Sequence, residues 1–431
     1  MEDNISVIIK IEIDNRYLGS INMKIRIIKG TNQIGGTITE ITSSKGTKIL
    51  IDFGKDLDTD VTDIPKIDWK EYHAVFITHN HEDHIGLINN IPDDVLVYVE
   101  ETSLEVYQVF LDFTSKLPLS RKINTFKINE EIKINDDIIV KSYITDHSAF
   151  NALMFLIECD DKKVLHTGDF RTNGYKGKLV EQVIKEIKSV DVVVMEGTTL
   201  SRNNLKNRLE KNLVKDIYDK TKKYDKVLIL QSSTNIDRVV SMYKAMKKSK
   251  KIFIEDIFTA NITTLLSKKG YTIPNPKTFY DVYSFVPMNR SEYRKDHKTD
   301  FYYQYIEPFK KDAHLVMTKE KFGILVKQSM LKDIKLYYNK GYLKNTCLIY
   351  SMWEGYKEKE DTNRFLKEIE NLGIDIITCH TSGHSDEAAR KMVLKELTYR
   401  YLIPIHTEQK EKFEKYKHHY ILNDGEELEI R

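Results

Sequence analysis

The sequence predicts a layered α/β protein in which a parallel-sheet module is inserted into a domain rich in strands. In the first 200 residues, apolar strand-like runs follow one another with few helices between them. From about Leu205, helix-like and strand-like segments alternate, which is typical of a parallel sheet. Apolar runs at 374–378 and 401–405 are each followed closely by a histidine, as in the first part. We therefore expect a first part at 1–200, an insertion at 201–375, and a segment at 376–431 that completes the first domain.

The first part contains a succession of expected strands. Residues 5–13 alternate apolar and other side chains, which predicts an N-terminal strand to which no role is assigned. Further strands are expected at 23–28, 48–52, 74–77, 137–144, 153–158, 163–166 and 190–195, with a helix at 178–188. Several of these strands end close to an acidic residue or a histidine, so polar groups gather at strand ends.

The insertion follows a βαβα order. Helix-like segments at 205–222 and 237–248 precede strand-like segments at 226–231 and 251–254. A polar and aromatic region at about 275–305 interrupts this order, which resumes with a strand at 346–350 and a helix at 362–371. The insertion is therefore predicted to carry its own parallel sheet.

Composition excludes several classes of protein. Hydrophobic residues make up 41% of the chain, so a sizeable core is possible. No apolar run reaches the roughly 18 residues that a membrane span needs, and the first residues do not resemble a secretory signal. The three cysteines form no CxxC pair, which argues against a disulfide framework. We expect a cytoplasmic protein with no membrane association.

Charge is unevenly distributed along the chain. Residues 201–375 hold 35 Lys and Arg against 22 Asp and Glu, whereas the remainder holds 32 against 43. A basic block in an otherwise acidic chain is compatible with a polyanionic partner. It is equally compatible with a solvated lysine-rich surface.

The strongest chemical signal is a run of potential metal ligands after the strand at 74–77. His79, His81, Asp83 and His84 lie within six positions. Imidazole and carboxylate together suit zinc and similar divalent ions, manganese included. So many potential ligands after a buried strand rarely coincide in a merely polar surface turn.

Other candidate ligands follow other predicted strands. Asp52, His147 and Asp169 each stand at or just after a strand end, although the last two alone would also fit ordinary turns. Together with the first cluster they form a regular series, which predicts a site for two ions. His166 and His380 lie nearby in sequence, but supporting or core positions suit them better than ligation.

This series resembles that of the metallo-β-lactamase fold. A narrower resemblance comes from Glu196-Gly-Thr-Thr199 after a strand, a large insertion, and then His380-Thr-Ser-Gly-His384-Ser-Asp386 and Ile403-Pro-Ile-His406. In this order the motifs are similar to those of the β-CASP nucleases, which include ribonuclease J and the cleavage nuclease of the polyadenylation machinery. The resemblance spans nearly the whole chain. It implies an αββα sandwich with an inserted, Rossmann-like parallel-sheet domain.

The resemblance also implies a role for each site residue. His79, His81 and His147 would hold one zinc, Asp83, His84 and His406 a second, and Asp169 would bridge them. Asp52 would orient a ligand histidine and is counted, with Asp83, among the catalytic groups. Glu196 and His384 would form a pair in which His384 donates a proton to the leaving oxygen. Ser382, Gly383 and Ser385 are the candidates for contacts with substrate phosphate.

The implied activity is hydrolysis of RNA phosphodiester bonds, by endonucleolytic or 5′-exonucleolytic action on single strands. Histidine at 406 resembles the RNA-acting members, because DNA-acting relatives carry valine there. A single-strand DNA nuclease of repair or defence, a small-molecule metallo-hydrolase and an inactive scaffold for RNA are the alternatives. A homodimer is a further expectation.

Three features of the insertion have two interpretations. Trp353 could stack on a base, although packing in the core is the favoured interpretation. Residues 231–235 could meet a phosphate or simply cap a helix. Tyr302, Tyr303 and Tyr305 could form a stacking patch, but a packed helix face is favoured.

Overall fold

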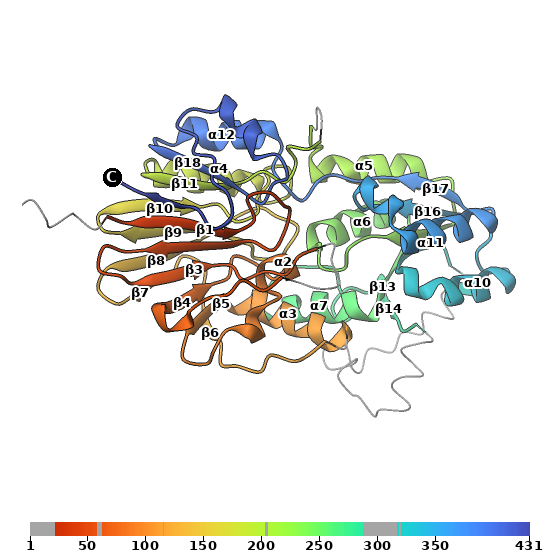
Figure 1. Cartoon of the computed structure of the whole chain (residues 1–431). Helices are drawn as coiled ribbons and strands as arrows, with labels where there is room; N and C mark the ends of the chain where they lie inside the picture. The colour runs from red at the N-terminus through yellow and green to blue at the C-terminus, as the bar shows by residue number, and fades with distance from the viewer. Residues whose placement is uncertain (1–21, 58–62, 115, 203–205, 288–316, 319) are drawn as a thin grey trace, which may run out of the picture.

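The protein is described by a computed structural model that covers residues 22–57, 63–114, 116–202, 206–287, 317–318 and 320–431. The predicted strand at 5–13, the tyrosines at 302, 303 and 305, and the start of the helix expected at 205 lie outside the described residues. Three β-sheets organise the described part (Figure 1).

The first sheet is formed mainly by the N-terminal part of the chain. Its strands, in spatial order, are β19 (Glu427–Glu429), β1 (Lys24–Lys29), β2 (Ile38–Thr42), β3 (Lys48–Ile51), β4 (Tyr72–Phe76), β5 (Leu96–Glu100) and β6 (Asn124–Phe126). The strands from β19 to β3 are antiparallel, whereas those from β3 to β6 are parallel. A C-terminal strand thus closes one edge of a sheet that begins at residue 24.

The second sheet stacks on the first. Its spatial order is β18 (Tyr401–Ile405), β11 (Val192–Glu196), β10 (Lys162–His166), β9 (Leu153–Cys159), β8 (Ile138–Ile144) and β7 (Glu131–Ile134). Buried apolar side chains from both sheets, among them Ile25, Phe76, Phe155 and Ile403, fill the space between them. Alternation of inward and outward side chains along each strand produces this layer.

Helices cover the outer faces of the two stacked sheets (Figure 1). The short α2 (Glu82–Ile85) and the longer α3 (Glu101–Thr114) pack on the first sheet through Ile85, Tyr107 and Leu111. On the second sheet lie α4 (Gly177–Ile187) and α12 (Glu387–Glu396). The expected αββα sandwich is therefore confirmed.

The third sheet belongs to the inserted part. It has the order β14 (Val282–Phe285), β13 (Ile252–Asp256), β15 (Phe322–Val326), β12 (Lys226–Leu230), β16 (Thr346–Tyr350) and β17 (Asp375–Thr378), and every pairing is parallel. On one face lie α5 (Glu210–Thr221) and α6 (Ile236–Lys248), and on the other α10 (Leu331–Asn339) and α11 (Glu360–Asn371). The expected parallel-sheet insertion is confirmed. Because β17 ends at Thr378, the division at 375 falls within a strand of this sheet, and the domain boundaries stay a prediction.

Two buried clusters stand out among the contacts that join the inserted part to the sandwich. One is apolar: α7 (Ile257–Lys268) packs its Ile257, Ala260 and Leu266 against Val106 and Phe113 of α3. The other is a buried network of charges around Arg171 and Arg238, described below. None of the helices in the described ranges is long and apolar enough to span a membrane.

Candidate metal centre

The first group of ligand atoms comes from the turn between β4 and α2 and from the loop after β8. Strand β4 ends at Phe76, and His81 is the N-cap of α2, so the chain turns sharply between them. Nδ1 of His81 lies 3.2 Å from Nε2 of His79 and 3.2 Å from Nε2 of His147. Three imidazole nitrogens that converge in this way suit one divalent cation.

The second group contains Asp83, His84, Asp169 and His406. Nε2 of His406 lies 3.1 Å from Oδ2 of Asp83, and Nε2 of His84 lies 3.4 Å from Oδ2 of Asp169. His406 follows β18 directly and has a φ of +52°, an uncommon conformation for a residue with a side chain. Such strain is often found where a function fixes the backbone.

Asp169 stands between the two groups. Its Oδ2 lies 4.0 Å from Nε2 of His79 and 3.8 Å from Nε2 of His147, in addition to the contact with His84. The side chain is buried, yet neither carboxylate oxygen has a hydrogen-bond partner among the described residues, and the same holds for Nε2 of His84. A buried carboxylate without partners is costly unless a cation offsets its charge. These atoms therefore fit a site for divalent metal.

The first group of ligands is electrostatically suited to bind metal, whereas in the second group, against the effect of burial, nearby aspartates raise the pKa values of His84 and His406. Burial, together with the neighbouring histidines, holds the pKa values of His79 and His147 well below the ordinary range. These rings are therefore neutral, which is the state in which imidazole binds metal. Burial would raise the pKa of Asp83, but His84 and His406 outweigh it and lower the pKa to about 2. Asp83 is thus ionised.

Hydrogen bonds fix the orientation of the ligand rings. Asp52, fully buried after β3, accepts a hydrogen bond from Nδ1 of His84 at 2.7 Å and another from the backbone N–H of Thr78 at 2.7 Å. The carbonyl oxygen of Gly383 lies 2.6 Å from Nδ1 of His147. Such partners set the tautomer of a ligand and commonly affect metal affinity strongly.

Glu196 and His384 lie beside Asp169. Glu196 ends β11 and accepts hydrogen bonds at 2.8 Å from the backbone N–H groups of Thr198 and Ser385, so its position is fixed. Nδ1 of His384 lies 4.0 Å from Oε1 of Glu196 but only 3.4 Å from Oδ2 of Asp169. The expected pair is therefore at the limit of ion-pair distance, and Asp169 is the nearer acid.

The three candidate substrate contacts have different positions. Ser382 and Gly383 line a cleft in front of the ligands, together with His384. Ser385 is fully buried and does not line this cleft; its hydroxyl accepts a hydrogen bond from Arg390 at 3.0 Å. Its backbone N–H holds Glu196, which makes Ser385 a supporting residue rather than a residue that faces substrate.

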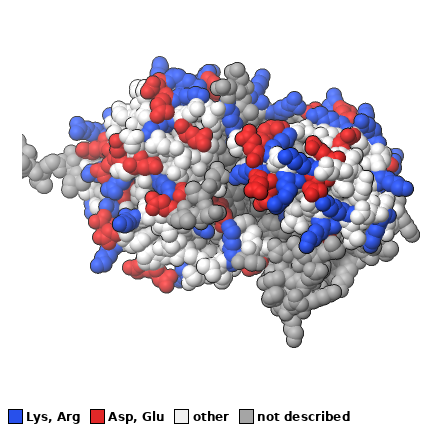
Figure 2. Space-filling model, turned by 45° about the vertical axis from the view of Figure 1, so that its right-hand side comes forward, with Lys and Arg blue, Asp and Glu red and all other residues white. Residues whose placement is uncertain are grey.

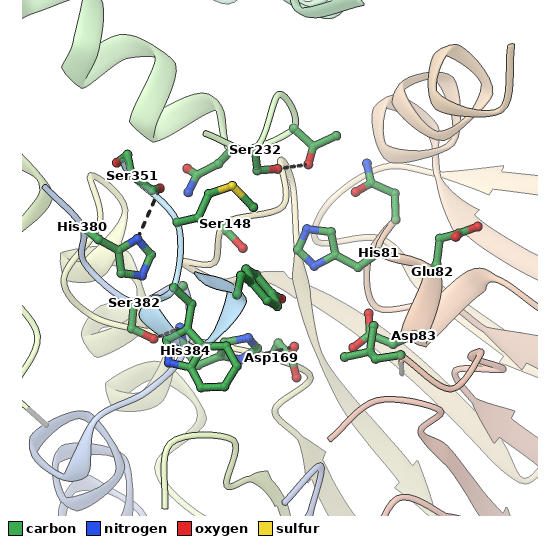
Figure 3. A pocket seen from close by; sticks show the side chains of 18 of the residues that line it. His81, Glu82, Asp83, Ser148, Asp169, Ser232, Ser351, His380, Ser382 and His384 are labelled. Carbon is green, nitrogen blue, oxygen red and sulfur yellow. Dashed lines mark hydrogen bonds and ion pairs between the residues drawn. The ribbon is translucent and has the colours of Figure 1, made fainter. Parts of the chain in front are cut away.

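The cleft has a volume of about 470 Å³ and lies between the sandwich and the inserted part. Figure 3 shows His81, Asp83 and Asp169 around it, with Ser232, Ser351 and His380 from the inserted part or its return segment. Nδ1 of His380 lies 3.3 Å from the carbonyl oxygen of Ser351, and burial lowers the pKa of His380 to about 3. Its ring is therefore neutral.

Trp353 corrects one sequence expectation. Core packing was favoured, but the indole is 39% exposed and lines the cleft. Arg202, which sequence reasoning missed, lines the cleft as well and stacks on this indole. The feature of the sequence that could have indicated a role for Arg202 is its position six residues after Glu196. The segment before α6 supports both interpretations given above, because Asn235 caps that helix and also lines the cleft.

Comparisons with known proteins agree with this geometry. A family described as "Beta-lactamase superfamily domain" matches residues 47–254. An "RNase J-like protein" of Methanocaldococcus jannaschii is 28% identical over 213 residues, which are 46% of this chain and 49% of that protein. The "Endoribonuclease YSH1" of Mycosarcoma maydis is 27% identical over 158 residues, 31% of this chain and 18% of that protein.

A solved structure extends the likeness of the fold to almost the whole chain. The crystal structure of a protein of unknown function from Enterococcus faecalis superposes with a TM-score of 0.73 at 18% identity, and the match covers 95% of this chain and 100% of that one. The fold and the ligand set are those of a metallo-β-lactamase-fold protein with a divalent metal site. Within that class, the names of the two curated relatives agree with the resemblance of the motifs to the β-CASP nucleases. The matches span about half of the archaeal relative and less than a fifth of the fungal one.

Proposed function

We propose that this protein is a two-zinc ribonuclease that hydrolyses phosphodiester bonds of single-stranded RNA. The observation that carries the proposal is the position of Asp169 between two convergent groups of ligands, as a buried carboxylate to which no described residue donates a hydrogen bond. One ion would be held by His79, His81 and His147, the other by Asp83, His84 and His406, with Asp169 shared. Manganese would suit the same ligands.

Two divalent ions, when bound, lower the pKa of a water molecule and neutralise charge on the phosphodiester in its transition state. The protein's own groups prepare for this chemistry. Asp52 and the carbonyl of Gly383 hold the rings of His84 and His147 in the orientation that directs Nε2 to the site. The depth of the pocket excludes bulk water from the ligand atoms, since the ligand side chains except His81 are buried.

His384 is the residue best placed to protonate the leaving oxygen. It faces the cleft, and its Nδ1 atom has no hydrogen-bond partner in the described part of the chain. Burial lowers the pKa of His384, while Asp169 and Glu196 oppose that change. Histidine is a side chain that can supply a proton to a leaving oxygen near neutral pH. Glu196, held by two backbone N–H groups, would favour the protonated ring.

RNA is the proposed substrate for three reasons. The curated relatives are named as an RNase J-like protein and an endoribonuclease. Position 406 is a histidine, as in the RNA-acting members of the β-CASP nucleases that the chain resembles, whereas the DNA-acting members have a valine there. The cleft is bordered by an inserted part with an excess of basic residues, and Figure 2 shows Lys and Arg side chains spread over it with acidic ones between them. A polyanionic substrate is compatible with that surface.

The test compares cleavage of matched 5′-monophosphate RNA and DNA oligonucleotides, with and without a chelator. We expect RNA alone to be cleaved, and only when metal is present. The product ladder separates endonucleolytic from 5′-exonucleolytic action. Cleavage of DNA alone would overturn the assignment to RNA. Full activity in chelator would overturn the role of metal, and the absence of cleavage from the metal-loaded protein would favour a small-molecule hydrolase.

A further inference from the structure

Arg202 occupies an unusual place in the cleft. It lies a few residues after the end of β11 and lines the cleft together with His384 and Trp353. Among the described residues that line the cleft, it is the one lysine or arginine. Although the inserted part has an excess of basic residues, Arg202 alone among its described Lys and Arg residues lines the cleft.

Among the described residues, no carboxylate forms an ion pair with the guanidinium of Arg202. Over the described residues, its side chain makes neither an ion pair nor a hydrogen bond, and its Nε atom is buried without a partner. Glu196 and Glu408 lie close enough to raise its pKa, against the larger opposing effect of burial, but neither forms an ion pair with it. A buried donor without a partner is costly, so a ligand that accepts its hydrogen bonds would be stabilising.

An aromatic contact holds the guanidinium in place. Its central carbon lies 4.5 Å from the centre of the Trp353 ring. A guanidinium over an aromatic ring is attracted to the face of the ring and can still donate its N–H groups to other acceptors. Arg202 is thus oriented by a ring and not by a carboxylate.

Trp353 is itself fixed. Its carbonyl oxygen accepts a hydrogen bond from the Tyr350 hydroxyl at 2.9 Å, and the Tyr356 ring packs edge-on at 5.4 Å between ring centres. Gly355 lies so close to the indole that a Cβ atom there would come within 2.4 Å of it. The indole therefore has little freedom to leave Arg202.

We infer that Arg202, positioned by Trp353, binds a phosphate group of the nucleic-acid strand beside the phosphodiester that is cleaved. The guanidinium edge offers paired donors to phosphate oxygens, a bidentate arrangement that arginine forms better than lysine. The nature of the strand rests on the proposed function. The phosphate could be an internal phosphodiester or a terminal 5′-phosphate, and both present the same oxygens to Arg202.

The chain supplies its own probe for this site. It contains two tryptophans, and Trp69 packs against Phe53 and Tyr72 in the sandwich, away from the cleft. In a Trp69→Phe protein, Trp353 is the single indole, and its fluorescence should change when a phosphate group binds to the guanidinium that lies over the ring. His384→Ala in the same protein prevents loss of the RNA during titration.

The experiment titrates the metal-loaded protein with short oligoribonucleotides of one sequence that carry a 5′-phosphate, a 5′-hydroxyl, or a 5′-hydroxyl with one neutral internal methylphosphonate. We expect Arg202→Ala to weaken binding of the 5′-phosphate RNA roughly 10- to 100-fold and Arg202→Lys to weaken it less. Arg208→Ala is the matched control, because Arg208 is exposed, pairs with Asp216 and does not line the cleft. It should bind as the parent does.

The arms separate the two sources of phosphate. Equal loss with 5′-phosphate and 5′-hydroxyl RNA assigns Arg202 to an internal phosphodiester, and loss confined to 5′-phosphate RNA assigns it to the terminus. Unchanged affinity of Arg202→Ala for all three RNAs would overturn the inference even if the parent cleaves RNA. The other outcome is that RNA binding depends on Arg202 but the parent protein, with His384 intact, cleaves no RNA. That outcome would contradict the proposed function and leave the inference about Arg202 standing. Arg202→Gln replaces the alanine variant if that variant does not fold.

Discussion

Asp52 lies 2.7 Å from Nδ1 of His84, and the opposite nitrogen of that ring points to Asp169. A buried carboxylate thus orients a ligand for a second buried carboxylate. Asp52→Asn removes the charge and can present an amide N–H to the same nitrogen, so the ring would turn or change tautomer. We expect metal affinity to fall roughly 10- to 100-fold, as for other partners of ligand histidines. Metal content after dialysis against a graded chelator measures this.

Asp137→Asn is the control for that variant. Asp137 also accepts hydrogen bonds from hydroxyl groups, those of Ser43 and Thr47, but lies outside the ligand groups. Its metal content should equal that of the parent. Retention of both ions by Asp52→Asn at parental affinity would show that Asp52 has only a packing role.

Substitution of His384 separates ligation from proton donation. If His384 is the general acid, His384→Ala should lower kcat by roughly 10²- to 10⁴-fold without loss of metal. The geometry makes this test necessary, because His384 also lies within a possible ligand group with His147 and Asp169. Metal content and single-turnover cleavage are measured on the same preparation. Loss of one ion in the variant would make His384 a ligand instead.

The buried hydrogen bonds and ion pair of Arg238 should contribute strongly to stability. Arg238 donates to Glu210 at 2.6 Å and 3.2 Å and to the carbonyl oxygens of Ser351 and Thr381, and all of its side chain is buried. Arg238→Met would leave Glu210 with Arg171, at 3.6 Å, as its remaining cationic neighbour among the described residues. We expect a loss of about 3–5 kcal/mol in the free energy of unfolding, measured by denaturant titration.

Arg364→Met is the surface comparison for this prediction. Arg364 pairs with Asp361 at 2.6 Å, but both side chains are largely exposed. Exposed pairs contribute little, so this variant should unfold almost as the parent does. Equal effects of the two substitutions would mean that the buried ion pair of Arg238 contributes no more to stability than an exposed one.

Glu255 should make stability depend on pH. Burial raises the pKa of Glu255 well above its ordinary value of 4.5, against a hydrogen bond from Thr263 at 2.8 Å. The folded state therefore binds this proton more tightly than the unfolded state. The resulting stabilisation is complete below the pKa that Glu255 has in the unfolded chain. It is lost as the pH rises through the pKa that Glu255 has in the folded protein.

Glu255→Gln tests that dependence, because glutamine is neutral at every pH. The variant should gain stability relative to the parent as pH rises from about 4 to about 8, as measured by denaturant midpoints. At the acid end both side chains are neutral, so the difference there isolates the effect of the substitution itself. A difference that stays constant over the range would rule out a buried neutral carboxyl at 255.

Much of the site could be predicted because its ligands follow strands. The strands before Asp52, His79, Asp169 and His406 are apolar runs, and the ends of neighbouring strands meet at one edge of a sheet. Local patterns of this kind need no knowledge of the inserted part. The series of ligands therefore converged in the structure where the sequence suggested it would.

The walls of the cleft could not be predicted in the same way. Exposure of Trp353 depends on where the loop after β16 meets the loop that carries Arg202, a contact between residues 151 positions apart. Ser385 is turned away from the cleft because its backbone N–H donates a hydrogen bond to Glu196, another contact between residues far apart in the sequence. Periodicity within a segment holds no information about such contacts, whereas it does define the apolar face of α11 or α6.

The parallel pairing of β18 with β11 has a consequence for synthesis of the protein. Chains grow from the N-terminus, and domains tend to fold as they emerge. Until residues 401–405 leave the ribosome, β11 presents an apolar sheet edge without its neighbour, and the pocket lacks His384 and His406. A nascent or truncated chain would therefore be prone to aggregate and would lack part of the ligand set. The metal site would be complete only once translation has passed His406, the last ligand.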